Sequence, residues 1–413
     1  MSTTKIKCPV EGIIDLDRLP GVGAEKIRRI VDAPELQRLR RIRQLGFTER
    51  VYPGATHSRF AHSLGAFQGA QRTLSQLKST GCDIPDEWYV ATALACLLHD
   101  VGHGPFSHTF EAVSRQSHES RTVEILQAGP RIPEALEAIG AGTRDRVLQL
   151  VQGQVDVHEL RYLADLVSSA LDCDRMDYLR RDALFTGAHY GVFDRDWLIR
   201  EMIPTQDGSA VVVVEKGRTA VEQYLIGRYH MFQNVYLHKT SRGFETAFRG
   251  LCRRVQALGV DVLPSAAFAF RALFERPLSL ELFLSLNDSM FENEFVGLLE
   301  SEDPTVQALA EALHFRRPLR QRTSRSGAED LSALRTVRME EAAGLGLDPE
   351  CAVWSDTAKD VPYWPYAPSK GRKGLRILQR NGELVDITEL SPTLAGLAAP
   401  IEVHRVYWVA GTK

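Results

Sequence analysis

The sequence lacks the features that mark secreted, membrane-spanning and strongly basic proteins. Its six cysteines are scattered and form no CxxC pair, which indicates reduced thiols rather than a disulfide framework. No apolar run approaches the roughly 20 residues that span a bilayer, and the N-terminus has no apolar signal segment. The net charge of −3 provides no basic field for nucleic acid. We therefore expect a cytoplasmic protein that does not bind membranes.

What the sequence does contain is ordinary for a globular protein. Hydrophobic residues make up 44% of the chain and charged residues 25%, and the 413 residues suggest two or three units. Apolar residues recur at helical spacing over most of the first 330 positions. The expected helices cover 24–45 with a break at Pro34, 61–80, a buried one at 88–99, 108–127, 132–151, 156–181, 218–257, 265–275, 279–285 and 292–315.

Strand signals are few and lie mostly late in the chain. The run VVVVEK at 211–216 predicts a small hairpin on the helical body, and Asn381-Gly382 predicts another. The tail IEVHRVYWVA predicts a further strand. Segments 314–330, rich in arginine, and 361–374, rich in proline, are expected to be loops.

These patterns together predict a mostly α protein. We expect a helical core over 1–320 and a smaller α+β part over 321–413 that serves regulation or oligomerisation.

Histidine clustering is the strongest chemical signal. Six of the twelve histidines fall within 62 residues, at positions 57, 62, 99, 103, 108 and 118. An apolar helix delivers His99 and Asp100 together at its end, where an unpartnered charge would be costly. A divalent metal takes neutral imidazole and carboxylate together. Alone, this dipeptide is more often a helix end followed by a turn, but the neighbouring histidines favour the metal.

An acidic cluster follows at 168–187. Asp174, Tyr178 and Asp182 are spaced to share one helix face, which could present them to one cavity. The alternative is a solvated charged helix, and a surface pair between Asp177 and Arg181 fits that interpretation.

Three motifs carry a family resemblance: RFAHSLG at 59–65, LLHDVGHGPFSH at 97–108 and LDCDRMDYLRRD at 171–182. In this order they resemble the HD-domain dNTP triphosphohydrolases, which include bacterial dGTPases and the vertebrate dNTPase that joins a sterile-alpha-motif domain to an HD domain. The resemblance runs from near residue 5 to about 240. It implies one divalent ion (iron, zinc, manganese, nickel or magnesium) on His62, His99, Asp100 and Asp174. It makes His57 a supporting or surface residue rather than a ligand.

The resemblance also implies a reaction. Water attacks the α-phosphorus and releases the deoxynucleoside and intact triphosphate, with the metal activating water or polarising the phosphoryl group. Additional magnesium can accompany the triphosphate. His108 is assigned to proton transfer with Glu111 orienting it, and His103 and His118 are assigned to the phosphate or the leaving oxygen.

Substrate-binding residues follow from the same resemblance. Arg59 is expected on the α-phosphate, Gln44 and Asp182 on the 3′-hydroxyl, Leu45 against a 2′-hydroxyl, Tyr178 and Tyr236 on the deoxyribose, and Arg228 and Lys239 on phosphates. Without the resemblance, Leu45 and both tyrosines would more often be core residues and Arg59 a surface salt bridge. Leu237 replaces a glutamine that touches the base in the vertebrate enzyme, so base preference stays open.

Regulation has candidates as well. Asp32, Gln37 and Arg40 correspond to residues that bind an activating nucleotide between subunits, and Arg317 to a further contact. The same residues could form the polar face of an amphipathic helix, and Lys7-Cys8 departs from the family's Asn-Asp. The resemblance implies a homo-oligomer (dimer, tetramer or hexamer). The arginine-rich segment could touch nucleic acid, although it is more typical of a solvated loop.

The leading hypothesis is therefore a metal-dependent dNTP triphosphohydrolase, with nucleotide activation as an added expectation. One alternative is an HD phosphohydrolase acting on another nucleotide or nucleic-acid phosphoester, which would need no deoxyribose pocket. The other is a catalytically silent nucleotide sensor, which would need no intact His108–Glu111 pair.

Overall fold

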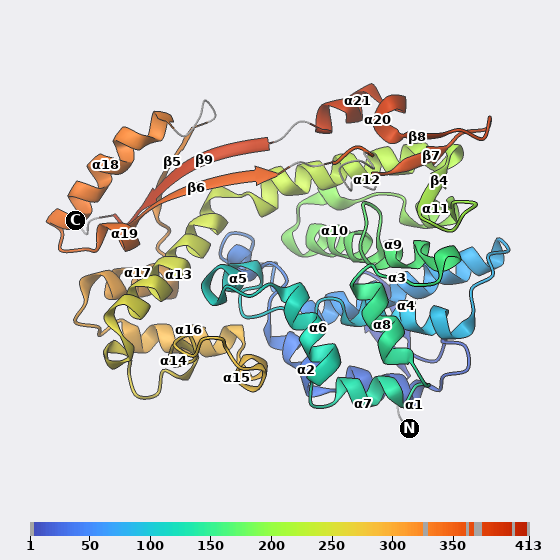
Figure 1. The fold of residues 1–413 in the computed structure, drawn as a ribbon. Helices are drawn as coiled ribbons and strands as arrows, with labels where there is room; N and C mark the ends of the chain where they lie inside the picture. Colours follow the sequence, from blue (N-terminus) through green and yellow to red (C-terminus); the bar gives the residue numbers. More distant parts are fainter. Residues whose placement is uncertain (1–3, 325–328, 361–362, 367–373, 399–400, 411–413) are drawn as a thin grey trace.

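The computed structural model describes residues 4–324, 329–360, 363–366, 374–398 and 401–410 (Figure 1). As predicted, the protein is mostly α, with small sheets. It opens with a hairpin of β1 (Lys5–Cys8) and β2 (Gly12–Asp15), followed by α1 (Ala24–Val31), α2 (Pro34–Gln37) and the 3-10 turn η1 (Arg38–Arg41). The predicted break at Pro34 is confirmed, but the helical stretch ends at Arg41 rather than at 45.

The centre of the molecule is a bundle around α4 (Asp86–Leu98). Every residue of α4 from Trp88 to Leu98 is buried, which confirms the helix that is apolar on all sides. It packs against α3 (Arg59–Ser79), α8 (Thr143–Val151) and α9 (Tyr162–Val167), while α3 also packs against α10 (Cys173–Thr186). The end of α4 and the start of α10 thereby lie close to the first half of α3, which carries His62.

In the first half of the chain, three helices predicted as continuous are broken. The stretch 108–127 consists of α5 (His108–Ser114) and α6 (His118–Ala128), separated at Arg115, whose φ of 59° ends α5 in the left-handed region. The stretch 132–151 consists of α7 (Ile132–Glu137) and α8. The stretch 156–181 becomes a short 3-10 turn η3 (His158–Leu160), α9 and then α10, which begins at an N-cap, Asp172.

The second half of the body is also interrupted. After α11 (Arg195–Arg200) and the expected hairpin of β3 (Met202–Pro204) and β4 (Val211–Val214), the stretch 218–257 divides into α12 (Arg218–Met231), a π-helical turn η6 (Phe232–Tyr236) and α13 (Lys239–Leu258). Then follow α14 (Phe268–Ala272), α15 (Leu280–Ser285), α16 (Asp288–Leu298) and α17 (Pro304–His314). π-turns inside helices often mark functional sites.

The C-terminal part forms two sheets. β5 (Arg320–Ser324), β9 (Ile401–Trp408) and β6 (Val353–Asp360) make a three-stranded sheet in the order β5-β9-β6, which runs alongside α13 in Figure 1. The chain between β5 and β6 carries α18 (Glu329–Gly344) and α19 (Pro349–Ala352). The strand in the tail is thus confirmed. The prediction of a loop over 314–330 is wrong at Arg320–Ser324, because these residues form β5 and pair with β9.

The second hairpin completes a sheet that starts in the body. β7 (Arg376–Leu378) and β8 (Leu384–Asp386) pair around Asn381-Gly382, where Gly382 has a φ of 88°. β7 also pairs with β4, which gives the order β3-β4-β7-β8. Short helical turns follow at α20 (Ile387–Leu390), α21 (Pro392–Ala395) and η9 (Gly396–Ala398). Most of the loop expected at 361–374 lies outside the described residues. Among the described helices, none has the length and apolar character required to cross a membrane.

Candidate metal centre and substrate pocket

Four predicted metal ligands converge from three helices. His62 comes from α3, His99 and Asp100 from the end of α4, and Asp174 from the first turn of α10. Nε2 of His62 lies 3.0 Å from Oδ1 of Asp174 and 3.6 Å from Oδ2 of Asp100. Nε2 of His99 lies 3.4 Å from an oxygen of each of these carboxylates. Ligand atoms around one transition-metal ion are separated by similar distances.

The donor atoms fit a divalent ion. Nε2 of His62 and Nε2 of His99 are buried and have no well-formed hydrogen bond to any described residue. Buried polar atoms without partners are costly, and two imidazoles with two carboxylates form a donor set suited to iron, zinc, manganese or nickel. We conclude that these four residues could hold one divalent metal ion.

Protons occupy this centre when no metal is bound. Burial works against the charged form of His62, but Asp174 and Asp177 outweigh it and raise its pKa to about 10. Burial likewise opposes the charge on His99, and the carboxylates of Asp100 and Asp174 raise its pKa to about 8. Against burial, the two imidazoles lower the pKa of Asp174. A metal ion entering the site must therefore displace protons.

A buried ion pair supports His62 from behind. Its Nδ1 lies 2.8 Å from Oδ2 of Asp177, and Arg181 donates to both oxygens of that carboxylate at 2.8 Å. The expectation of a solvated Asp177–Arg181 pair is therefore wrong: the side chains are 2% and 0% exposed. Gly65 makes room for them, because a Cβ there would lie 2.0 Å from Oδ1 of Asp177. In the sequence, the feature that could have indicated this support is the glycine three residues after His62, in His62-x-x-Gly65. A residue without a side chain at that place leaves room for Asp177.

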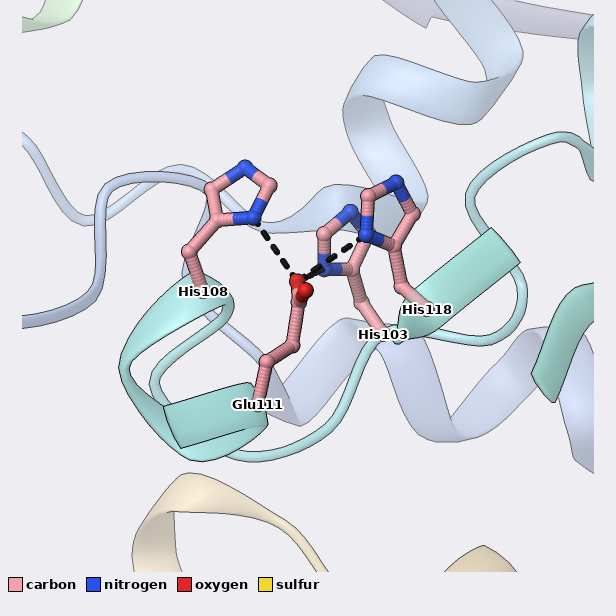
Figure 2. Close-up of side chains that lie close together, drawn as sticks. All are labelled: His103, His108, Glu111 and His118. Carbon is pink, nitrogen blue, oxygen red and sulfur yellow. Dashed lines mark hydrogen bonds and ion pairs between the residues drawn. The ribbon is translucent and has the colours of Figure 1, made fainter. Parts of the chain in front are cut away.

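A second cluster joins three histidines to one carboxylate (Figure 2). Oε1 of Glu111 lies 2.7 Å from Nδ1 of His108 and 2.9 Å from Nδ1 of His118, and 3.9 Å from Nδ1 of His103. His103 stacks on His118 with ring centroids 3.9 Å apart, and its Nε2 lies 3.2 Å from Oδ1 of Asp100. Figure 2 shows His108 and His118 converging on Glu111 from two helices.

The contacts of Glu111 fix the tautomers of its partners. Against partial burial, the imidazoles of His108 and His118 hold the pKa of Glu111 well below its usual range. An ionised Glu111 accepts a hydrogen bond from the Nδ1–H group of each ring, so Nε2 of each ring is left as the atom available for a substrate. These four residues are also close enough to ligate a metal. Because Glu111 already satisfies two of these rings, the donor set of His62, His99, Asp100 and Asp174 fits an ion better.

One cavity of about 540 Å³ connects these groups. Among the predicted site residues, it is lined by Gln44, Leu45, Arg59, Asp100, His103, His108, His118, Asp174, Tyr178, Asp182 and Tyr236. Two predicted phosphate ligands are not in its lining. Lys239 lines a neighbouring cavity that shares Leu237 with the first, and Arg228 lies over the ring of Phe232 at 5.2 Å.

Arg59 is buried in the lining of the cavity beside Asp100. Its Nε donates to Oγ of Ser107 at 2.8 Å, and Nη1 donates to Oδ2 of Asp100. The side chain is only 4% exposed, so the surface salt bridge that we considered for it is excluded. A buried arginine held beside a metal-binding carboxylate is well placed for an anionic ligand.

The lining of the cavity also carries the predicted sugar residues. The π-turn brings Tyr236 to Asp182, where its hydroxyl donates to Oδ2 at 2.8 Å. Tyr178 meets Tyr236 edge to face with centroids 6.2 Å apart. His57 is buried next to Asp182, so it is a supporting residue and not a surface one.

Sequence reasoning missed one wall of the cavity. Arg242, Glu245 and Arg249 of α13 line it, at spacings that place them on one helix face. In the sequence, this spacing of charged residues shortly after Tyr236 is the feature that could have indicated them. The C-terminal sheet holds this wall, since Asp356 of β6 accepts from Arg242 with an Nε distance of 2.7 Å, and the hydroxyl of Tyr407 in β9 donates to the carbonyl of Lys239.

The predicted regulatory residues lie on the surface around α1 and α2. Nε of Arg40 donates to Oε1 of Gln37 at 2.7 Å, and Asp32 lies 3.8 Å from Arg28. Arg317 pairs with Glu311 of α17 instead of with these residues. The structure thus groups Gln37 with Arg40 and gives Arg317 a separate partner.

The comparisons with known proteins agree with this site. The HD domain family model matches residues 59–182, the stretch that contains all four metal ligands. The chain is 32% identical to the uncharacterized protein YwfO of Bacillus subtilis (strain 168) over 386 residues, which cover 92% of this chain and 87% of that protein. It is 26% identical to the deoxynucleoside triphosphate triphosphohydrolase SAMHD1 of Gallus gallus, over 74% of this chain and 53% of that protein.

A solved structure is similar over nearly the whole chain. The crystal structure of a phosphohydrolase (BT4208) from Bacteroides thetaiotaomicron VPI-5482 has a TM-score of 0.81 and 28% sequence identity, and covers 98% of this chain and 99% of that one. Fold and site together define an HD-domain hydrolase with a metal centre. Within that class, the chain belongs to the HD-domain family related to the dNTP triphosphohydrolases.

Proposed function

We propose that this protein hydrolyses deoxynucleoside triphosphates to the deoxynucleoside and inorganic triphosphate. The observation that carries the proposal is the single cavity, whose lining contains Arg59, Asp100 and Asp174 together with Asp182 and Tyr236. A phosphate and a deoxyribose could be held at the same time by these two groups. Relatives named deoxynucleoside triphosphate triphosphohydrolase add support.

The metal centre serves the phosphate. When bound to His62, His99, Asp100 and Asp174, a divalent ion supplies Lewis-acid polarisation and activation of water at neutral pH. The proposal specifies a divalent ion and does not choose among iron, zinc, manganese, nickel and magnesium. Additional magnesium can arrive with the triphosphate.

The chain's own groups act around that centre. Arg59, held by Asp100 and Ser107, offers its guanidinium to the α-phosphate. His108, oriented through Nδ1 by Glu111, presents Nε2 to the leaving 5′-oxygen. With both ring nitrogens protonated, it gives the Nε2 proton to that oxygen as the P–O bond breaks, and the attacking water releases a proton to the solvent. His103 and His118 contact the phosphate beside it. The ordered contacts keep these groups in place before the substrate arrives.

A second group of lining residues selects the sugar. Asp182 and Gln44 bind the 3′-hydroxyl, the bulk of Leu45 opposes a 2′-hydroxyl, and Tyr178 and Tyr236 pack on the deoxyribose. Arg228 and Lys239, which lie outside the cavity lining, would have to move to reach the outer phosphates. An activating nucleotide at Asp32, Gln37 and Arg40 between copies of a homo-oligomer also belongs to this proposal.

The test is a substrate panel. Purified protein is incubated with each dNTP and each rNTP, with and without GTP or a second dNTP, and the products are separated by anion-exchange chromatography. We expect inorganic triphosphate from dNTPs and little product from rNTPs. Release of pyrophosphate with a monophosphate, or of orthophosphate alone, would instead indicate a phosphohydrolase for another phosphoester. Binding without any product would indicate a nucleotide sensor.

A further inference from the structure

We propose that His57 is a positioning residue that sets the selectivity of this site for a 3′-hydroxyl. The inference rests on the proposed function, and it concerns a residue that the family resemblance gives only as a supporting or surface residue. It follows from the way one residue holds both groups assigned to the 3′-hydroxyl, Asp182 and Gln44.

His57 and Tyr236 divide the carboxylate of Asp182 between them. Nε2 of His57 lies 2.7 Å from Oδ1, and the hydroxyl of Tyr236 donates to Oδ2 at 2.8 Å. The side chains of His57 and Asp182 are each 1% exposed, so water does not compete for this contact. Each carboxylate oxygen keeps further lone pairs, because an ionised carboxylate has about four acceptor sites. Asp182 lines the cavity and can accept a hydroxyl there without giving up either protein contact.

The ring of His57 has a defined tautomer. Its Nδ1 is buried and has no hydrogen-bond partner in the part of the chain that the structure describes. A proton on Nδ1 would be a buried donor without an acceptor, so the ring carries its proton on Nε2 and donates it to Asp182. The ring also stacks on Phe185, with centroids 4.8 Å apart. Asp182 therefore faces the cavity as an acceptor of fixed orientation.

The backbone of His57 holds Gln44 in turn. The backbone N–H of Gln44 donates to the backbone carbonyl of His57 at 3.0 Å. One residue therefore positions both expected partners of the 3′-hydroxyl.

The loop that carries His57 is itself fixed. A Cβ at Gly54 would lie 2.4 Å from the carbonyl oxygen of Phe185, which shows how closely the loop approaches α10. The hydroxyl of Tyr52 donates to the carbonyl of Asn234, in the same π-turn as Tyr236. The loop thus contacts α10 and the π-turn, the elements that carry Asp182 and Tyr236.

The experiment removes the 3′-hydroxyl of the substrate and the imidazole of His57 separately. Values of kcat/KM are measured for a dNTP and for the matching 2′,3′-dideoxynucleoside triphosphate, on the wild type, His57→Phe and His57→Gln. Phenylalanine keeps the ring that stacks on Phe185 but has no donor. Glutamine places an amide donor near the position of Nε2. His158→Phe, at an exposed histidine of η3, is the matched control.

A positioning role predicts a loss that depends on the hydroxyl. We expect His57→Phe to lower kcat/KM for the dNTP about tenfold or more, since a buried carboxylate loses a partner, and to change the dideoxy value less than about threefold. His57→Gln should recover most of the selectivity, and His158→Phe should behave as the wild type. Equal losses on both substrates, or a glutamine variant no better than phenylalanine, would overturn the inference.

Failure of the proposed function is visible separately. A wild type that forms no inorganic triphosphate overturns the function and this inference with it. A wild type that prefers the dNTP, combined with a His57→Phe variant that keeps the same preference, overturns the inference alone. If His57→Phe does not fold, as judged by its melting temperature, His57→Gln is compared with His57→Asn. The shorter asparagine amide cannot reach Asp182, so equal selectivity in this pair would also overturn the inference.

Discussion

Nδ1 of His62 lies 2.8 Å from Oδ2 of Asp177, on the edge of the ring that faces away from the other metal ligands. Burial opposes ionisation of this carboxyl, but Arg181 and His62 lower its pKa to about 2. Asp177 is therefore an anion that fixes the tautomer of His62 and increases the basicity of Nε2. It is not itself expected to touch the metal.

Asp177→Asn should weaken metal binding without abolishing the site. We expect the metal affinity to fall about 10- to 100-fold, as is usual when such a supporting carboxylate is removed, and activity to return at high metal concentration. The measurement is metal content after dialysis against a competing chelator. Asp145→Asn, at an exposed aspartate paired with Arg144, is the control. Unchanged affinity would remove Asp177 from the centre.

Gly65→Ala should damage the same support through sterics. The new Cβ would lie 2.0 Å from Oδ1 of Asp177 and 2.4 Å from Nη2 of Arg181, and neither buried side chain has room to withdraw. We expect a loss of about 1–3 kcal/mol in the free energy of unfolding, typical of overpacking, together with reduced metal content. Urea unfolding measures the first effect. Gly344→Ala, in the last turn of α18, controls for added bulk, because the same atom would meet nothing within 4 Å there.

Metal affinity should increase with pH. In the metal-free protein the pKa of His62 is raised to about 10 and that of His99 to about 8, so both imidazoles are protonated below about pH 8 and only His62 between about 8 and 10. Each proton released on binding makes the affinity rise about tenfold per pH unit. We expect a slope near two below pH 8 that decreases above it. Calorimetry in buffers of different ionisation enthalpy counts the protons, and a slope near zero would contradict the assignment.

His108→Asn should separate proton transfer from metal binding. Because His108 contacts Glu111 and not the four metal ligands, we expect kcat to fall about 10²- to 10⁴-fold while metal content stays unchanged. Glu111→Gln should have a smaller effect in the same direction, since it disturbs only the orientation of the ring. His158→Asn serves as the control. A His108→Asn variant that turns over normally would transfer the proton role to His103 or His118.

The sequence allowed the metal ligands to be predicted because their motifs are short and local. His99 and Asp100 are adjacent, and Asp174 opens a helix of its own. Their convergence with His62 came from the family resemblance, since spacing alone does not bring α3, α4 and α10 together. The same holds for Asp182 and Tyr236, which are 54 residues apart and meet only through the π-turn.

Other features depend on long-range packing that a periodic pattern does not contain. The break at Arg115 and the π-turn at 232–236 interrupt stretches whose apolar spacing is continuous. The buried pair of Asp177 and Arg181 could not be distinguished from a surface pair in the sequence, because buried and exposed ion pairs on a helix share the i, i+4 spacing. The strand β5 was not predicted, because its alternating arginines give no apolar pattern. It is a strand because it pairs with β9, which lies about 80 residues later.

The most direct test of the central claim is the product formed in ¹⁸O-labelled water. Wild-type protein loaded with one divalent metal is incubated with a dNTP, and the products are analysed by ³¹P NMR and mass spectrometry. Attack at the α-phosphorus predicts inorganic triphosphate that carries one ¹⁸O and a deoxynucleoside that carries none, with no product from His99→Ala. Label in the deoxynucleoside, or release of pyrophosphate or orthophosphate in place of triphosphate, would contradict the account.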